Sequence, residues 1–335
     1  MIIKKVKCFM VTRHPLSTSW AVAIALLVLL CTTHGRAQSG DSTAQRLTDG
    51  QPNLNGIWNN VGSSHIPLEL PDEFVGRLPT QEEIDQLVKT RSDRGKARTW
   101  QGHENSRTVG AYANYWFDWF WKEPAAVDAP ALLIEPANGQ LPSLTTTAKA
   151  SIEYYREHLH DSYSTMETGD RCLSRGTYGI MMPTAYNNGK MFFHTPDHLV
   201  ILSEMIHNAR IIPISNEPHV DDAITQWNGD PRAYWDDDTL VVESRNFKAV
   251  KNQRGPGSRA PQTEARQVTE RFSLLDTDTL HYELRVMDPQ TYIEPWTVAF
   301  NYRRDNNYVQ FEYACHEGNY AVPNSLSGQR VQEHK

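Results

Sequence analysis

The chain of 335 residues carries a formal net charge of −7, and charged residues make up only 22% of it. No run rich in Lys and Arg stands out, so the electrostatic footprint of a nucleic-acid-binding protein is missing. We therefore expect no nucleic-acid partner.

The first 37 residues have the three parts of a bacterial signal peptide. A basic stretch with Lys4 and Arg13 precedes an apolar run from Trp20 to Cys31, and residues 35–37 form a small-x-small cleavage signal. The apolar run is short for a bilayer span, which needs roughly 20 residues; an uncleaved anchor is the alternative interpretation. No later stretch is apolar and long enough to cross a membrane, so the sequence predicts a soluble mature protein without a membrane span, periplasmic or secreted.

The next part of the chain predicts a leader and two helices. Residues 38–53 are polar, which is typical of a disordered leader, and residues 54–335 are expected to form a single β-rich domain with a helical N-terminal part. A helix is predicted at about 80–93, because Thr80 and Glu83 have the spacing of a capping box. A second helix is predicted at about 145–158. Between them, the aromatic run Tyr112–Trp121 is expected to cover the core or to form an aromatic wall of a ligand pocket.

From Lys190 onward, short apolar and β-branched runs are separated by turn residues. This pattern predicts consecutive strands with tight connections, which favours an antiparallel meander. We expect a mainly β fold in which the meander closes into a lipocalin-like barrel or folds over as a sandwich, with a few peripheral helices. The predicted strands are 190–195, 199–206, 210–214, 239–245, 267–275, 279–287, 294–303 and 308–314.

Cys172 and Cys315 are the only cysteines after the predicted signal peptide. Two thiols in an oxidising compartment are expected to form a disulfide; the alternative is two free buried thiols that act as small hydrophobic groups. The disulfide would bring Asp170 and Arg171 beside His316 and Glu317.

Ionisable residues gather between His194 and Arg210 in a region that is otherwise apolar. Such groups cost free energy unless they are paired or face a cavity. One interpretation is an acid-base site in which His207 or His194 moves a proton, a carboxylate orients the ring and an arginine stabilises an oxyanion. The catalytic candidates are His207, Glu204, Arg171, Asp170 and His316. The ligand-binding candidates are Tyr186, Asn187, His194, Arg210, Glu317, Trp119 and Trp296.

Other interpretations of these residues remain open. A metal site could use His194, His198 and His207, although the Glu-x-x-His spacing of Glu204 and His207 suits a helix better than a strand. In a non-catalytic cell-envelope binding module, Glu204 and Arg210 would form a buried ion pair and His207 would be a hydrogen-bonded histidine of the core. Tyr186 and Asn187 would then be turn formers, and Trp296 would belong to the core. The phosphate-loop, dinucleotide, Gly-x-Ser-x-Gly, Cys-x-x-Cys-His and His-Glu-x-x-His motifs are missing, so no cofactor or metal is expected.

Two resemblances add to these predictions. Gly56-Ile57-Trp58, followed by a β meander, resembles the Gly-x-Trp signature that opens lipocalin-like (calycin) barrels. Residues 53–58, 170–172, 182–188, 204–213 and 314–320 resemble strings found in a large set of uncharacterised exported bacterial proteins, and this second resemblance covers most of the mature chain. It implies export and an autonomous domain, but it implies no reaction.

The sequence thus favours an exported β-barrel-like protein with an aromatic-lined pocket for a small apolar or aromatic molecule. It leaves open whether the protein is also a cofactor-independent isomerase, lyase or hydrolase. The alternatives are a metal-dependent enzyme with a His-rich site and a non-catalytic binding module. The identity of the ligand or substrate and the oligomeric state stay undetermined at this stage.

Overall fold

The computed structural model describes residues 45–104, 129–253 and 260–334, with the side chains of all of these except 95–104. The predicted signal peptide lies outside this part of the chain. So does the aromatic run Tyr112–Trp121 with its ligand-binding candidate Trp119.

Alternation of inward apolar and outward polar side chains shapes one antiparallel sheet. In β9 (Thr279–Met287), every second side chain from Leu280 to Val286 is fully buried. Successive strand residues face opposite sides of a sheet, so these four side chains share its inner face. On the outer face, β8 and β9 present charged residues such as Arg271 and Glu283, which lie opposite each other in the ladder.

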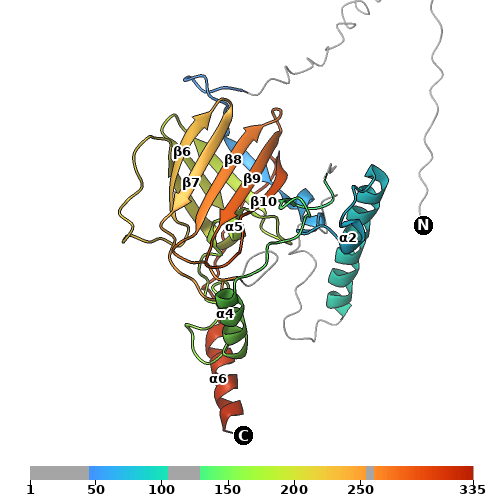
Figure 1. Cartoon of the computed structure of the whole chain (residues 1–335), viewed down its shortest axis with the longest axis vertical. Helices are drawn as coiled ribbons and strands as arrows, with labels where there is room; N and C mark the ends of the chain where they lie inside the picture. Colours follow the sequence, from blue (N-terminus) through green and yellow to red (C-terminus); the bar gives the residue numbers. More distant parts are fainter. Residues whose placement is uncertain (1–44, 105–128, 254–259, 335) are drawn as a thin grey trace, which may run out of the picture. The chain divides into compact units, whose positions relative to one another are not determined.

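Nine strands lie side by side in the order β5-β4-β3-β1-β10-β9-β8-β7-β6, and the tenth, β2, pairs with β10 (Figure 1). The two ends of this sheet meet where Ile214, just after β5, forms a parallel bridge with Ala233 of β6. The sheet is therefore a nearly closed barrel, which is one of the two arrangements that the sequence predicted. The strands are β1 (Gly56–Asn59), β2 (Leu133–Glu135), β3 (Gly189–His194), β4 (His198–Ser203), β5 (Asn208–Pro213), β6 (Asp230–Asp236), β7 (Thr239–Arg245), β8 (Gln267–Leu274), β9 (Thr279–Met287) and β10 (Trp296–Arg304).

Aromatic rings fill the middle of the barrel. The rings of Phe272 and Tyr282 have their centroids 5.0 Å apart, Tyr282 lies 5.2 Å from Phe300, and Phe192 lies 5.9 Å from Phe272. At these spacings the rings are in packing contact. The barrel thus encloses a buried aromatic cluster.

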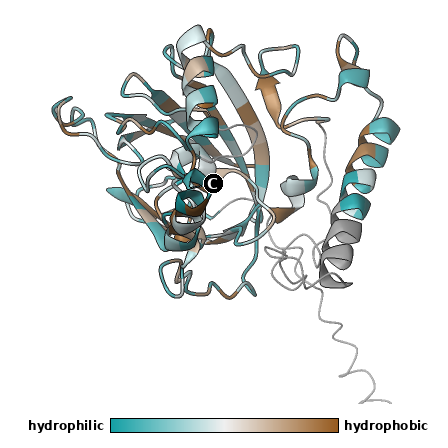
Figure 2. Ribbon diagram, turned by 90° about the horizontal axis from the view of Figure 1, so that it is seen from below, coloured by the Kyte–Doolittle hydropathy of each residue, from teal (hydrophilic) through white to brown (hydrophobic). Residues whose placement is uncertain are grey.

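Both predicted helices are present. In α2 (Gln81–Glu104), the capping box forms as expected: the Glu83 N–H donates to Thr80 Oγ1 at 3.3 Å, and the Thr80 N–H donates to Glu83 Oε2 at 2.8 Å. The described part of α2 is mostly hydrophilic, with a few apolar residues such as Ile84 (Figure 2). Helix α4 (Thr146–Glu157) is capped by Thr145, whose Oγ1 accepts from the Ala148 N–H at 3.1 Å.

Two further helices and three short 3₁₀ turns complete the described elements. Helix α5 (Gly176–Met181) is buried along its whole length, and the Met181 carbonyl accepts from Tyr302 OH at 2.5 Å and from Asn60 Nδ2 at 2.8 Å. Helix α6 (Ala321–Glu333) has no buried residue. Within the described residues, no helix combines the length and apolar character that crossing a membrane requires. The 3₁₀ turns are η1 (Val61–His65), η2 (Asp72–Phe74) and η4 (Met205–His207).

Two predicted strands differ from those in the structure. The strand predicted at 199–206 ends at Ser203, because Ile206 and His207 have positive φ angles of 62° and 39° in the turn that leads into β5. The strand predicted at 308–314 forms no ladder with any described strand. Residues 45–53, within the predicted leader, include an antiparallel bridge between Arg46 and Pro52.

Candidate functional site

Glu204, a predicted catalytic residue, lies in the turn between β4 and β5 and is 2% exposed. Its Oε2 accepts a hydrogen bond from Tyr308 OH, and its Oε1 accepts one from the Phe311 N–H at 3.3 Å. Both donors belong to the stretch that follows β10, here called the C-terminal segment (residues 305–320). The buried carboxylate therefore anchors this segment to the barrel.

His207 and Asp170 also contact the C-terminal segment. His207 is exposed, so the interpretation as a core histidine was wrong, and its Nδ1 lies 2.7 Å from the Tyr313 carbonyl oxygen. A carbonyl can only accept, so Nδ1 carries the hydrogen in this contact. The backbone carbonyl of Asp170 accepts from Asn319 Nδ2 at 2.9 Å.

The predicted disulfide between Cys172 and Cys315 is present, with their Cα atoms 5.6 Å apart. It joins the two polar stretches that the sequence expected it to join. His316 and Glu317, however, are exposed in the turn after Cys315. Arg171 is half-buried, and burial lowers the pKa of its guanidinium. Of the catalytic candidates near the disulfide, Asp170 thus holds the C-terminal segment through its backbone and His316 faces solvent, while Arg171 is partly buried.

Arg210 points into the barrel and does not pair with Glu204, so that predicted ion pair was wrong. Both of its terminal nitrogens bind the Glu270 carboxylate of β8, Nη1 at 2.9 Å from Oε1. Glu270 is fully buried, and its Oε1 also accepts from Tyr282 OH at 2.8 Å. Burial opposes the charge on Arg210, but the carboxylate offsets this and raises the arginine's pKa.

Glu270 is the residue of this pair that the sequence analysis missed. It sits between Val268 and Phe272, both of which are inward residues of the same strand. In a strand with a period of two, an ionisable residue at an inward position must find a partner inside the barrel. That position was the signal that could have identified it.

The remaining described ligand-binding candidates lie in a turn before β3 and in the core. Tyr186 and Asn187 are half-buried before β3, and the positive φ of 55° at Asn187 fits the turn-forming role. Trp296 is 4% exposed and packs edge-on against Tyr178, with ring centroids 6.0 Å apart, so it belongs to the core.

His194 is the one candidate histidine that is buried, at 4% exposure. The Leu54 N–H donates to its Nδ1 at 3.4 Å, so the neutral ring carries its hydrogen on Nε2, and the ring centroid lies 5.7 Å from that of Trp235. Burial lowers the pKa of His194, and the nearby charge of Asp49 opposes this shift.

We expect His194 to make the protein less stable as the pH falls. The histidine pKa in an unfolded chain is about 6.5. The folded-state pKa of His194 lies lower, so below about pH 6.5 the unfolded chain binds a proton that the folded chain does not. His194→Asn should therefore reduce the loss of unfolding free energy between pH 7.5 and 5.5 in denaturant titrations, while the exposed control His198→Asn should not. Equal pH dependence in wild type and His194→Asn would contradict this expectation.

The three histidines of the metal interpretation are not gathered. His194 is buried at the end of β3, whereas His198 and His207 are exposed at opposite ends of the β4–β5 hairpin. Across the described ranges, no group of three His, Cys, Asp or Glu residues could hold a metal ion.

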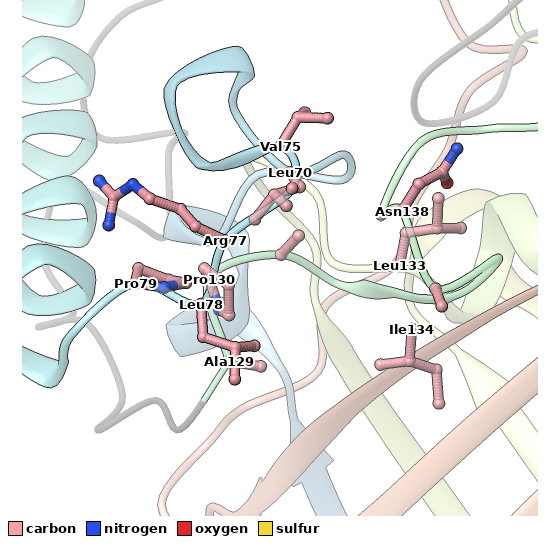
Figure 3. A pocket seen from close by; sticks show the side chains of 14 residues that line it. Leu70, Val75, Arg77, Leu78, Pro79, Ala129, Pro130, Leu133, Ile134 and Asn138 are labelled. Carbon is pink, nitrogen blue, oxygen red and sulfur yellow. The ribbon is translucent and has the colours of Figure 1, made fainter.

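A groove of about 510 Å³ lies outside the barrel, between two loops that the sequence analysis did not select (Figure 3). One wall is the loop that carries Val75 to Pro79 together with Ala129 and Pro130. The other is formed by Leu133, Ile134 and the turn that carries Asn138. The lining residues are Leu70, Val75, Gly76, Arg77, Leu78, Pro79, Ala129, Pro130, Ala131, Leu133, Ile134, Ala137, Asn138 and Gly139.

Hydrogen bonds hold the two walls of the groove in place. The Leu70 N–H donates to the Gly139 carbonyl at 2.8 Å, and the Leu133 N–H donates to the Leu68 carbonyl at 2.9 Å. A Cβ atom at Gly139 would lie 2.6 Å from Leu70 Cβ, and Gly139 has a φ of 69°, so this close approach requires glycine. Strand β2 fastens the wall to β10 through the pairing of Leu133 with Val298.

The groove is apolar, and Arg77, the cation among its described lining residues, is paired with a carboxylate. Leu78 is 93% exposed, and Val75 and Ile134 are also exposed. The Arg77 guanidinium turns towards α2, where it binds both oxygens of Glu83 at 2.9 and 2.8 Å (Figure 3). Exposed apolar side chains that converge on one hollow are typical of a binding site.

A search with protein-family models and a search of curated proteins each found no match to this chain. The geometry of the described residues is therefore the basis for a functional assignment.

Proposed function

We propose that this chain is an exported protein that binds a small apolar molecule in the groove between residues 70–79 and 129–139. The observation that carries the proposal is an apolar hollow of about 510 Å³ with walls fixed by hydrogen bonds. Small-molecule sites have volumes of roughly 300–1,000 Å³ and are usually preformed and mostly apolar. In this proposal the barrel acts as the rigid support of the groove.

The expected ligand is uncharged where it contacts the protein. Arg77 forms an ion pair with Glu83, so the described lining residues of the groove offer no free cation to attract an anionic group. Removal of apolar surface from water contributes roughly 25 cal/mol per Å² and supplies the driving force. Asn138 lies at the edge of the groove in Figure 3. Its Oδ1 accepts from the Gln140 N–H at 3.0 Å, and its Nδ2 is the donor that would orient one end of the ligand.

Export is supported by the three-part pattern of residues 1–37 and by the disulfide between Cys172 and Cys315, which persists in an oxidising compartment. We do not include catalysis in the proposal. Glu204 is engaged by Tyr308 and Phe311, and His207 contacts the backbone of Tyr313. These contacts fix the chain and leave no reason to assign those side chains a proton-transfer role.

Ala137→Trp is expected to weaken binding at the groove by at least about tenfold, because an indole from this exposed lining position fills the hollow. Binding is measured as the fluorescence increase of the apolar dye N-phenyl-1-naphthylamine. The protein is purified from the periplasm of cells that express the full chain, and its intact mass should show a chain that begins at Gln38.

The matched control is Ala223→Trp, which adds the same side chain to an exposed loop remote in sequence from the groove. Wild type and Ala223→Trp should bind the dye equally. If wild type gives no saturable signal, or if Ala137→Trp binds as well as wild type, the groove is not the binding site.

A further inference from the structure

Residues 308–314 form a strand-like stretch that is paired with no strand of the described residues. Their sequence, Tyr-Val-Gln-Phe-Glu-Tyr-Ala, favours a β-strand. No helix, turn or bend interrupts them, yet they pair with no strand of the described sheet. Two of their apolar side chains are directed to solvent: Val309 is 63% and Phe311 70% exposed. Such a stretch is a ready template for another strand.

The stretch is held in place along its length. Tyr308 OH donates to Glu204, the Phe311 N–H donates to the same carboxylate, and Tyr313 O contacts His207. The Tyr308 ring lies so close to Gly189 that a Cβ atom there would be 2.3 Å from it. Just beyond the stretch, Cys315 is tied to Cys172. A partner strand would therefore meet a preordered template and lose little affinity to chain ordering.

The contacts leave one backbone edge open. In an extended chain, the N–H and C=O of one residue point to one side and those of the next residue to the other. Phe311 N and Tyr313 O point towards the barrel, where they contact Glu204 and His207. By this alternation, the backbone groups of Gln310 and Glu312, the two neighbours of Phe311, point the opposite way. They have no backbone hydrogen bond in the part of the chain that the structure describes.

We propose that residues 308–314 pair with the same residues of a second copy of this chain, antiparallel and centred on Phe311. In this register Gln310 of each copy lies opposite Glu312 of the other, and the open N–H and C=O groups of both residues form hydrogen bonds across the two-fold axis. This interface does not depend on the groove or on a ligand. It assigns a partner to the stretch that the sequence analysis wrongly placed in the barrel sheet.

The charges and shapes of the stretch favour this register. Glu312 meets an uncharged Gln310, so no like charges are directly opposed, which would be destabilising. Phe311 meets its own counterpart in a non-hydrogen-bonded position, where the Cα atoms of an antiparallel pair are about 4.5 Å apart and side chains are closest. The alternate residues Val309 and Tyr313 face each other across the axis on the same side as Phe311. A second copy thus supplies both an apolar and a hydrogen-bonded match.

The outer face of the neighbouring strands extends the apolar surface. Gln310 Nε2 donates to the Leu202 carbonyl of β4 at 3.3 Å, which places the stretch beside the β3–β5 strands. Two residues before Leu202 on β4, Val200 lies on the outer face between Phe193 of β3 and Ile211 of β5. Phe193 and Ile211 are 49% and 62% exposed. On β8 and β9 the outer face instead carries charged residues such as Arg271 and Arg285. The apolar side of the barrel is therefore the side next to residues 308–314.

A cysteine at position 311 tests the register in the full mature chain. Phe311→Cys should form a disulfide-linked dimer under mild oxidation, because Cα atoms about 4.5 Å apart suit a disulfide. Val309→Cys is the matched control. Its two copies would be separated by four residues along the strand, about 13 Å, which is too far for a bridge. The yield of linked dimer is read on non-reducing gels, and intact mass confirms that Cys172 and Cys315 remain joined.

The association itself is measured by sedimentation equilibrium from micromolar to submillimolar protein. Phe311→Asp should raise the dimer dissociation constant at least about tenfold, since it places two carboxylates opposite each other. Ile293→Asp, a change at a 66% exposed residue outside the interface, should leave it unchanged. A wild type that stays monomeric over this range, or cross-linking that is equal at positions 309 and 311, would overturn the proposal.

Discussion

Replacement of Glu270 by alanine is expected to lower the free energy of unfolding by about 3–5 kcal/mol, because removal of one member of a buried ion pair leaves the other charge uncompensated. Arg210 is 4% exposed and Glu270 is fully buried, so water cannot take the place of the lost carboxylate without opening the barrel. Tyr282 OH, which donates to Glu270 Oε1 at 2.8 Å, also loses its acceptor. The change is measured by urea unfolding followed by circular dichroism.

The double variant Arg210→Met/Glu270→Leu should recover most of this loss, because two apolar side chains of similar size replace the pair without leaving a charge behind. Asp236→Ala provides the surface control: it breaks the exposed contact between Asp236 and Arg271 and should change the stability little. If Glu270→Ala and Asp236→Ala proved equally mild, the Arg210–Glu270 pair would not be a buried, mutually dependent unit.

The strands that the sequence predicted well are those whose alternation is strong. The predicted boundaries of β9 agree with the structure, because Leu280, Tyr282 and Leu284 alternate with polar residues and tight turns flank the strand. Strand β6 was missed because Asp-Pro-Arg-Ala-Tyr-Trp-Asp has a charged residue at both ends, an arginine and a proline, and no β-branched residue. Its place in the sheet comes from its long ladder with β7, which depends on the fold and not on its own pattern.

Residues 308–314 show the limit of local pattern. They have the composition of a strand, but the chain leaves the sheet after β10, where the Asp305 N–H donates to the Ile57 carbonyl. Beyond that point, side chains such as Tyr308, and later the disulfide, hold the chain on the outside of the barrel. A high strand propensity means that a segment can pair with another strand. The path of the chain before the segment determines which strands lie close enough to pair with it.

The candidate site was predicted less well than the fold, because its residues come together from distant parts of the chain. The polar residues of 194–210 were correctly seen as groups that need partners, but the partner of Arg210 lies on β8, 60 residues along the chain. Which strands face each other across the barrel is set by how the sheet closes. The groove walls are loops without periodic pattern, and they come together through contacts such as Leu70 with Gly139. Neither the contact of Arg210 with β8 nor the approach of the two groove walls can be recognised from a short stretch of sequence.

Removal of the disulfide is expected to be the other large perturbation. The bridge closes a loop with a sequence separation of 143 residues. In the chain-entropy model, a loop of this length restricts the unfolded chain enough to stabilise the folded state by about 5 kcal/mol, and losses of about 2–5 kcal/mol are typical when a native disulfide is removed. We expect Cys172→Ala/Cys315→Ala to lose stability within this range, as measured by urea unfolding beside the wild type under oxidising conditions.

Removal of the disulfide should change the folded structure far less than the stability. This difference distinguishes a bridge that restricts the unfolded chain from one that holds the C-terminal segment in place in the folded state. Glu204 still accepts from Tyr308 and Phe311, and His207 still contacts Tyr313, so residues 308–313 have anchors that do not involve Cys315. In the cysteine-free variant, the Phe311 amide should therefore keep its protection from hydrogen exchange under native conditions. Cys172→Ala/Cys315→Ala/Glu204→Gln should lose that protection, because the amide then faces a weaker, uncharged acceptor. If the cysteine-free variant alone lost Phe311 protection while its unfolding free energy stayed at the wild-type value, the disulfide would act as a local clamp on the C-terminal segment and not by restricting the unfolded chain.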